Sequence, residues 1–158
     1  MSQEMTGAAR KDAGGAWAAT RAWLRTEAAM RWLLAGLIIV GALLRLTNLN
    51  WDAFTHLHPD ERFLTMVTSA MRLPDSPGQF FDTSQSPMNP YNIGYDFFVY
   101  GTLPLFIVRV VAEFGQKINE VAQIWQANGG PITLTGYDGV HLVGRFMSGL
   151  FDLMVIPL

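Results

Sequence analysis

The chain has 158 residues, half of them hydrophobic and only 15% charged, and its mean hydropathy is positive. So few charges are typical of a membrane protein rather than of a soluble domain. The net charge of −2, with no basic cluster interleaved with aromatic residues, argues against a nucleic-acid-binding surface. The absence of cysteine excludes disulfides, thiolate metal sites and cysteine nucleophiles.

Residues 1–27 are predicted to form a polar tail before an apolar stretch at 28–47. This stretch centres on the run Leu33–Val40 and is flanked by Arg31 and Arg45. Its uncharged part is shorter than the roughly 20 residues that cross the hydrocarbon, but terminal arginines lengthen a span by reaching the headgroups. Because no small-x-small cleavage site follows it, we interpret this stretch as an uncleaved first transmembrane helix.

The next segment, 48–94, is predicted to be a loop that contains a short interfacial helix near 59–72. Proline stands at its first helical position, and Pro74 ends the helical pattern. Helical phase places Asp60 on the apolar side with Phe63, Val67 and Met71, and Glu61 on the polar side with Thr65, Thr68 and Arg72. We therefore expect Asp60 to face the buried side and Glu61 to face solvent.

Two more apolar stretches, at 95–114 and 140–158, are predicted to cross the membrane on either side of a loop at 115–139. Pro104 should kink the second span, because its ring nitrogen cannot donate to the helical ladder. The third span stops within an apolar run, so we expect the chain to be the front of a longer protein. The predicted fold is all-α, a polytopic transmembrane bundle with about three spans in this chain.

The distribution of basic residues predicts the orientation. Residues 1–31 contain five Lys or Arg, whereas the loop at 48–94 contains only Arg62 and Arg72. By the positive-inside rule the N-terminus is cytoplasmic and this loop lies outside. The loop at 115–139 is then inside, and Arg145 lies near the inner end of the third span. We expect an integral protein of a bacterial plasma membrane.

The run from His58 to Phe63 places the two acids Asp60 and Glu61 just beyond a membrane span. A carboxylate at this boundary can meet both a lipid-borne donor and a soluble acceptor, and it can take a proton from a hydroxyl that attacks an electrophilic carbon. The alternative is that both acids only complement the dipole at a helix N-terminus.

A metal site is a second interpretation of the same loop. His56 and His58 alternate, so in an extended segment both imidazoles point the same way, and Asp60 can join them as an oxygen ligand for zinc or manganese. The competing interpretation is that both histidines hydrogen-bond a phosphate or the backbone. We predict that no cofactor is required and keep this divalent-metal site as the rival.

The order of features resembles the C-type glycosyltransferase superfamily. A charged tail, one span, an outer loop with an Asp-Glu pair opening an interfacial helix, and a second span after a proline-containing turn occur here in that order. The resemblance covers roughly residues 30–158 and is greatest to family 39, the branch of protein O-mannosyltransferases and aminoarabinose transferases, or phospholipid carrier-dependent glycosyltransferases. Residues Gly144–Phe151 resemble the Arg-apolar-apolar-Ser pattern of the family's third helix.

The resemblance implies a many-helix membrane enzyme that transfers a sugar from a polyprenyl-phosphate donor to an acceptor hydroxyl outside the cytoplasm, usually with inversion. It implies Asp60 as the catalytic base or the group that positions the acceptor, and Glu61 as its support. Membrane lipid is a further partner, and the acceptor is undefined. This chain alone is not expected to be active. The residues expected to bind substrate are His58, Arg62, Tyr91 and Arg145.

Polar residues inside the predicted spans should face other helices, because they are costly in lipid. In the third span they are His141, Arg145, Ser148 and Asp152, which share one face. Arg145 is expected either to pair with an acid or to approach the donor phosphate. In the second span, Arg109 and Glu113 are four residues apart and are expected to pair.

A function of a different class is also compatible with the sequence. The chain can belong to a polytopic transporter or a noncatalytic membrane assembly subunit, in which Asp60 and Glu61 cap a helix and Asp152 lies on a substrate or ion path. The aromatic residues of the outer loop, among them Tyr91, are expected to form a belt at the headgroups or a lid over the donor.

Overall fold

The computed structural model describes residues 17–18, 21–23, 26–124, 126–127 and 130–156. Most of the predicted tail at 1–27 and the end of the predicted third span lie outside these residues. The described residues between 45 and 152 form one compact unit, and the described residues before 45 belong with 153–156 to another. The elements are α2 (Glu27–Leu46), α3 (Pro59–Ala70), α4 (Pro77–Phe81), a 3-10 helix (Pro90–Ile93), α5 (Thr102–Ala122), β1 (Gln126–Ala127), β2 (Gly130–Pro131) and α6 (Tyr137–Val155).

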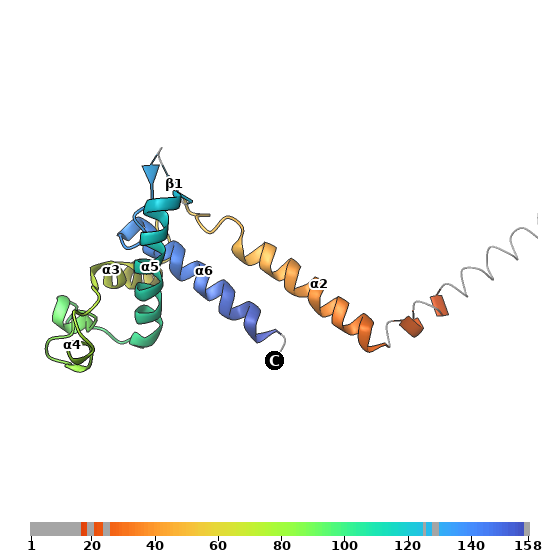
Figure 1. The fold of residues 1–158 in the computed structure, drawn as a ribbon, viewed down its shortest axis with the longest axis horizontal. Helices are drawn as coiled ribbons and strands as arrows, with labels where there is room; N and C mark the ends of the chain where they lie inside the picture. Colours follow the sequence, from red (N-terminus) through yellow and green to blue (C-terminus); the bar gives the residue numbers. More distant parts are fainter. Residues whose placement is uncertain (1–16, 19–20, 24–25, 125, 128–129, 157–158) are drawn as a thin grey trace, which may run out of the picture. The chain divides into compact units, whose positions relative to one another are not determined.

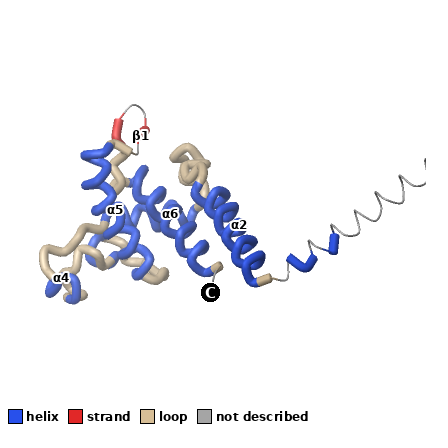
Figure 2. Tube along the Cα trace, turned by 45° about the vertical axis from the view of Figure 1, so that its right-hand side comes forward, coloured by secondary structure: helices blue, strands red, loops and turns tan. Residues whose placement is uncertain are grey.

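The helical fold class is confirmed for the described residues. Helices carry nearly all of the regular structure, and the two short strands pair antiparallel with Gln126 opposite Pro131. Between α3 and α5 the chain is mostly loop, interrupted by α4 and the 3-10 helix (Figure 2). The prolines at 74, 77, 87 and 90 explain this, because each fixes its own φ and removes a backbone donor.

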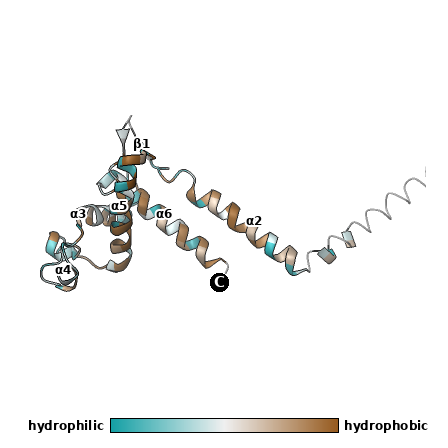
Figure 3. Cartoon of the chain, viewed as in Figure 1, coloured by the Kyte–Doolittle hydropathy of each residue, from teal (hydrophilic) through white to brown (hydrophobic). Residues whose placement is uncertain are grey.

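α2 is the first predicted span, and its sequence explains its ends. The hydroxyl of Thr26 accepts a hydrogen bond from the Ala29 amide, and acidic Glu27 and basic Arg45 stand at the ends where the helix dipole favours them. Hydrophobic residues occupy most of its length (Figure 3), and Ala29 is the one buried residue of this helix. Of the helices in the described part of the chain, α2 is the one long and apolar enough to cross a membrane.

The second predicted span is not confirmed. The helix in this region, α5, begins at Thr102 and ends at Ala122, and it carries charged residues at 109, 113, 117 and 120. Residues 95–101 are irregular instead, and Phe98 packs with Val67 in the core beside α3. The predicted kink at Pro104 is wrong, because Pro104 lies in the first turn of α5, where the missing amide removes no helical hydrogen bond.

The third predicted span corresponds to α6, which begins at Tyr137 instead of 140. It contains Asp138, Arg145 and Asp152, and it does not have the apolar composition of a membrane-crossing helix. Asp152 forms an ion pair with Arg45 at the end of α2. The three-span bundle is therefore reduced to one candidate span among the described residues.

α3 is confirmed almost as predicted, with Pro59 as its first residue and its last at Ala70. Its apolar side packs as expected, since Val67 and Met71 are fully buried with Phe98 and Leu105. The predicted solvent side is wrong, however, because Thr65 and Thr68 are also buried. α3 is thus covered on two sides, and the Thr68 hydroxyl is satisfied by donating to the Leu64 carbonyl.

Arg109 of α5 joins three parts of the compact unit. Its Nη1 donates to the Thr68 and Ser69 carbonyls at the C-terminus of α3 and to the Thr135 carbonyl before α6, at 3.1 to 3.3 Å. Its Nη2 lies 2.6 Å from Glu113, so the predicted pair is confirmed. A buried guanidinium at these carbonyls both satisfies the helix end and opposes its dipole.

A second core lies under the turn that leads into α6. Leu134 packs there with Ala112 of α5 and with Val140 and Val143 of α6. The turn passes so close to α6 that a Cβ added at Gly139 would stand 2.2 Å from the Thr133 carbonyl oxygen. Only a residue without a side chain fits at this position.

We predict that Gly139→Ala destabilises the protein by about 1–3 kcal/mol, because the obstructing atoms are backbone and cannot rotate away. The measurement is thermal or denaturant unfolding in detergent, followed by helical circular dichroism. Gly144→Ala is the matched control in the same helix, since its added Cβ would meet Val108 at an ordinary 4.0 Å. Equal stability of the two variants would contradict the packing described here.

Candidate functional site

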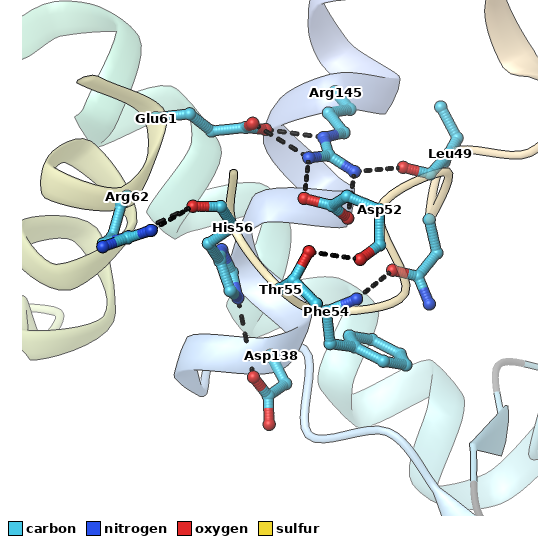
Figure 4. A network of polar contacts seen from close by, with 10 residues as sticks. Leu49, Asp52, Phe54, Thr55, His56, Glu61, Arg62, Asp138 and Arg145 are labelled. Atoms are coloured by element: carbon cyan, nitrogen blue, oxygen red, sulfur yellow. Dashed lines mark hydrogen bonds and ion pairs between the residues drawn. The ribbon is translucent and has the colours of Figure 1, made fainter. Parts of the chain in front are cut away.

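Arg145 of α6 is the centre of a polar network that joins the turn after α2 to the start of α3 (Figure 4). Its guanidinium donates to both carboxylate oxygens of Glu61, at 2.5 and 2.9 Å, and to both of Asp52, at 2.8 and 3.1 Å. A further bond of 2.6 Å goes to the Leu49 carbonyl. The planar fork of arginine suits two bidentate carboxylates at once, which a lysine cannot match.

The network is largely removed from water. The Asp52 side chain is fully buried, and the side chains of Arg145 and Glu61 are 13% and 27% exposed. The ring of Trp51 lies 5.1 Å from the guanidinium and covers it further. The Arg145 hydrogen bond holds the pKa of Asp52 down at about 2, despite the opposing effect of burial.

The turn between α2 and α3 has an unusual backbone. Four non-glycine residues in it have left-handed φ values between 48° and 64°: Asn48, Ala53, Phe54 and His56. Each such residue costs roughly 1 kcal/mol or more, so the turn needs compensating contacts. Asp52 supplies them through Arg145 and through its own carbonyl, which accepts from the Thr55 hydroxyl.

The two acids at the start of α3 have opposite environments, and the predicted assignment of their faces is wrong. Glu61 turns inward to Arg145, whereas Asp60 is exposed and accepts a hydrogen bond of 3.1 Å from the Tyr100 hydroxyl. The bond to Asp60 raises the pKa of Tyr100. Helical phase misled here because the cation that attracts Glu61 lies in α6, 84 residues away.

The residues predicted to bind substrate do not gather at one point. His58 is exposed directly before α3, and exposed Arg62 donates two hydrogen bonds to the carbonyl at position 56. The Tyr91 hydroxyl donates to the carbonyl of residue 98 in the loop. Arg145 binds two carboxylates. This favours the expected role of pairing with an acid over the expected role of binding the donor phosphate.

The predicted metal set of His56, His58 and Asp60 does not converge. His56 has φ 49°, so the extended geometry that the alternation requires is absent, and its ring is buried while His58 and Asp60 are exposed. Among the described residues no group of three His, Asp or Glu side chains is arranged to hold a metal ion.

Sequence reasoning missed Asp52 and Tyr100. Asp52 lies in an irregular turn and Tyr100 in a loop inside a run that reads as apolar, so neither has a helical or alternating pattern that indicates a partner. The prediction from the sequence also placed Arg145 near the inner membrane face, on the opposite side of the membrane from the loop at 48–94. The contacts of Arg145 with Asp52 and Glu61 of that loop do not agree with this placement.

Asp52 predicts a specific acid sensitivity. Since its pKa is lowered on folding from 3.8 to about 2, its ionisation stabilises the fold fully above about pH 4, and this contribution is lost as the pH falls toward 2. The loss should amount to about 2 kcal/mol, and Asp52→Asn should abolish this part of the pH dependence. Unfolding measured between pH 5 and 2 tests it, with exposed Asp96→Asn as the control. An unchanged pH slope in Asp52→Asn would refute the assignment.

Arg145 should be far more important for stability than the neighbouring ion pair of Arg45. Arg145→Gln leaves the buried Asp52 carboxylate and the partly buried Glu61 carboxylate without their cation, and it should lower the free energy of unfolding by about 3 kcal/mol or more. Arg45→Gln breaks the Arg45–Asp152 pair, whose side chains are 59% and 46% exposed, and should cost less than about 1 kcal/mol. Chemical unfolding of both variants in detergent compares them, and similar losses would argue against the buried network.

Comparisons with known proteins add nothing to the description of this site. The sequence matches no protein-family model, and comparisons with curated proteins and with solved structures find no significant match.

Proposed function

We propose that this chain is part of an integral membrane glycosyltransferase that moves a sugar from a polyprenyl-phosphate donor to an acceptor hydroxyl. One observation carries the proposal: the neighbouring acids Asp60 and Glu61 have separate environments. Glu61 is paired with Arg145, whereas Asp60 is exposed at the first turn of α3 with a neutral tyrosine as its hydrogen-bond donor. An acceptor hydroxyl can approach an exposed carboxylate, whereas both oxygens of Glu61 are already bound to Arg145.

The membrane setting supports this role. α2 is a candidate anchor, and the excess of Lys and Arg before it favours a cytoplasmic N-terminus, so that α3 lies on the outer side of a plasma membrane. Asp60 follows the end of α2 by fewer than twenty residues. A carboxylate there meets both a donor held in the lipid and an acceptor from the aqueous side.

The proposed reaction is a single inverting displacement. A carboxylate oxygen of Asp60 accepts the proton of the acceptor hydroxyl while the hydroxyl oxygen attacks the anomeric carbon of the sugar. The new bond forms as the bond from this carbon to the phosphate oxygen breaks, and polyprenyl phosphate leaves with the electron pair. Tyr100 orients the carboxylate through its hydrogen bond.

The leaving phosphate needs cations rather than a proton donor, because it departs as an anion. Arg62 and His58 are exposed on either side of Asp60, so we assign them to the donor phosphate. Arg145 is left out of this role, since its donors are already bound to Glu61 and Asp52. Arg145 and Glu61 then serve to position α3, and membrane lipid surrounds the donor chain.

Asp60→Asn should reduce sugar transfer by roughly a hundredfold or more, because it removes the proton acceptor and keeps the size of the side chain. The measurement uses the full-length protein in membranes at matched expression, with a radiolabelled polyprenyl-phosphate sugar as donor.

Asp75→Asn is the matched control, since Asp75 is an exposed acid in the same loop. Tyr100→Phe should give a smaller loss than Asp60→Asn, because it removes only the orienting bond. Transfer by Asp60→Asn at the level of the control would rule out Asp60 as the base, and loss of folded protein is checked by gel filtration of each variant.

A further inference from the structure

Two buried histidines attach the turn before α3 to α6. His56 belongs to the turn and His141 to α6, and they are 2% and 4% exposed. Their ring centroids are 4.3 Å apart. Phe54 of the same turn lies edge-on to His141 at 5.9 Å, and Tyr137 of α6 lies 4.2 Å from His56. These four rings, two from each element, form what we call the ring cluster.

The ring cluster has room only for neutral histidines. Within the described residues, none of the four ring nitrogens of His56 and His141 makes a hydrogen bond. The Tyr137 carbonyl lies near the His141 ring without meeting hydrogen-bond geometry. A neutral imidazole is held in such a place by ring packing, whereas an imidazolium carries a charge and two donors that need water or an acceptor. An added proton therefore opposes the burial of these rings.

Charged side chains surround the ring cluster on several elements. Asp138 lies 3.6 Å from Nε2 of His56 (Figure 4), but its side chain is 68% exposed, so water screens its charge. α5, which packs against α6, carries an arginine and a glutamate that pair with each other. The full set is Asp52 on the turn, Glu61 and Arg62 on α3, Arg109 and Glu113 on α5, and Asp138 and Arg145 on α6.

These surroundings make His141 the histidine that resists protonation. Burial lowers the pKa of His141 from its ordinary value of 6.5, and the neighbouring His56 and Arg145 lower it further. The Tyr137 carbonyl and the Asp52 carboxylate act in the opposite direction without reversing the shift. A proton on His141 is therefore easier to accommodate when the ring leaves the cluster for water.

The turn is also held against the preference of its own backbone. Ala53, Phe54 and His56 have left-handed φ values between 48° and 64°, which residues with a side chain avoid. Such a turn keeps this conformation only while contacts outside it hold it in place. Weakening the ring cluster therefore favours release of the turn.

We propose that the ring cluster is a proton-sensitive latch, which holds the turn at 52–57 against α6 at neutral pH and releases it as the pH falls below about 6.5. Because His141 has the lower pKa in the closed form, its contribution to closure is complete above pH 6.5 and is lost as the pH falls from there toward the lower value. This range lies above that of Asp52, whose stabilising effect is lost only below about pH 4.

Release of the turn also affects the network of Arg145. The turn carries Asp52, which is one of the two carboxylates bound to Arg145, and the other is Glu61 at the start of α3. Opening therefore loosens the first turn of α3, where Asp60 lies. An effect of acid on sugar transfer rests on the proposed function, whereas the opening itself does not and is measured separately.

Hydrogen exchange followed by mass spectrometry measures the opening directly. The whole chain in detergent is compared at about pH 7.5 and about pH 5.5, after correction for intrinsic exchange rates. The amides of Ala53, Phe54 and Thr55 report on the turn, because each is hydrogen-bonded in the closed form. We expect their protection to fall about tenfold, the effect of one proton taken up over one pH unit below the ordinary histidine value. Peptides from the middle of α5 should keep their protection.

His141→Phe is the decisive variant, because phenylalanine keeps an aromatic ring in the cluster and cannot take up a proton. It should remove the tenfold acid effect on the turn. His141→Gln is a second variant that takes up no proton, and it too should remove the acid effect if phenylalanine packs poorly. His58→Asn is the matched control, since His58 is exposed and lies outside the ring cluster, and it should respond to acid like the unmodified chain.

Two results would overturn the proposal. The first is equal protection of the turn at both pH values in the unmodified chain, an outcome that does not depend on the folding of any variant. The second is an acid effect that persists in the His141 variants or disappears in His58→Asn, since either places the proton elsewhere. Loss of sugar transfer plays no part in these outcomes.

Discussion

The double ion pair of Arg145 is the interaction on which the rest of the compact unit depends. One guanidinium binds Asp52 from the turn after α2 and Glu61 from the first turn of α3, with the side chains mostly out of water. Removing charges from water is expensive, and the expense is recovered here by five hydrogen bonds to a single planar group. These bonds hold a turn with four left-handed non-glycine residues that would otherwise relax.

The same interaction gives two adjacent acids different environments. Glu61 points inward to Arg145. Asp60, its neighbour in the helix, therefore lies on the exposed side, where the Tyr100 hydroxyl donates to it. In the proposed enzyme the inward acid positions the helix and the outward acid takes the proton. Arg109 acts similarly at the other end of α3, where it donates to the carbonyls of Thr68 and Ser69. The helix is held at both ends by arginines of other elements.

The spans show where apolar content misleads. Residues 95–114 read as one membrane helix, but Phe98 belongs to the core beside α3, and α5 continues through charged positions up to Ala122. An apolar stretch of this length arises either when a helix faces lipid or when two elements each bury one side. The average hydropathy of a window does not separate these two cases. The charged residues at 109, 113 and 117 do, because they indicate a helix that buries one side instead of a helix that faces lipid. α2 is apolar enough to cross a membrane because its charged residues lie only near its ends.

The sequence alone determined what depends on near neighbours. It correctly predicted the α2 helix, the start of α3 at Pro59 and the pairing of Arg109 with Glu113, because helix phase, proline geometry and contacts four residues apart are local. Only the tertiary structure decided that Glu61 turns inward, that Thr65 and Thr68 are buried, and that His56 meets His141. The partners of Glu61 and His56 are more than 80 residues away, and the Arg109 side chain that contacts Thr68 is 41 residues away. Chain folding brings such partners together without any repeating pattern in the sequence.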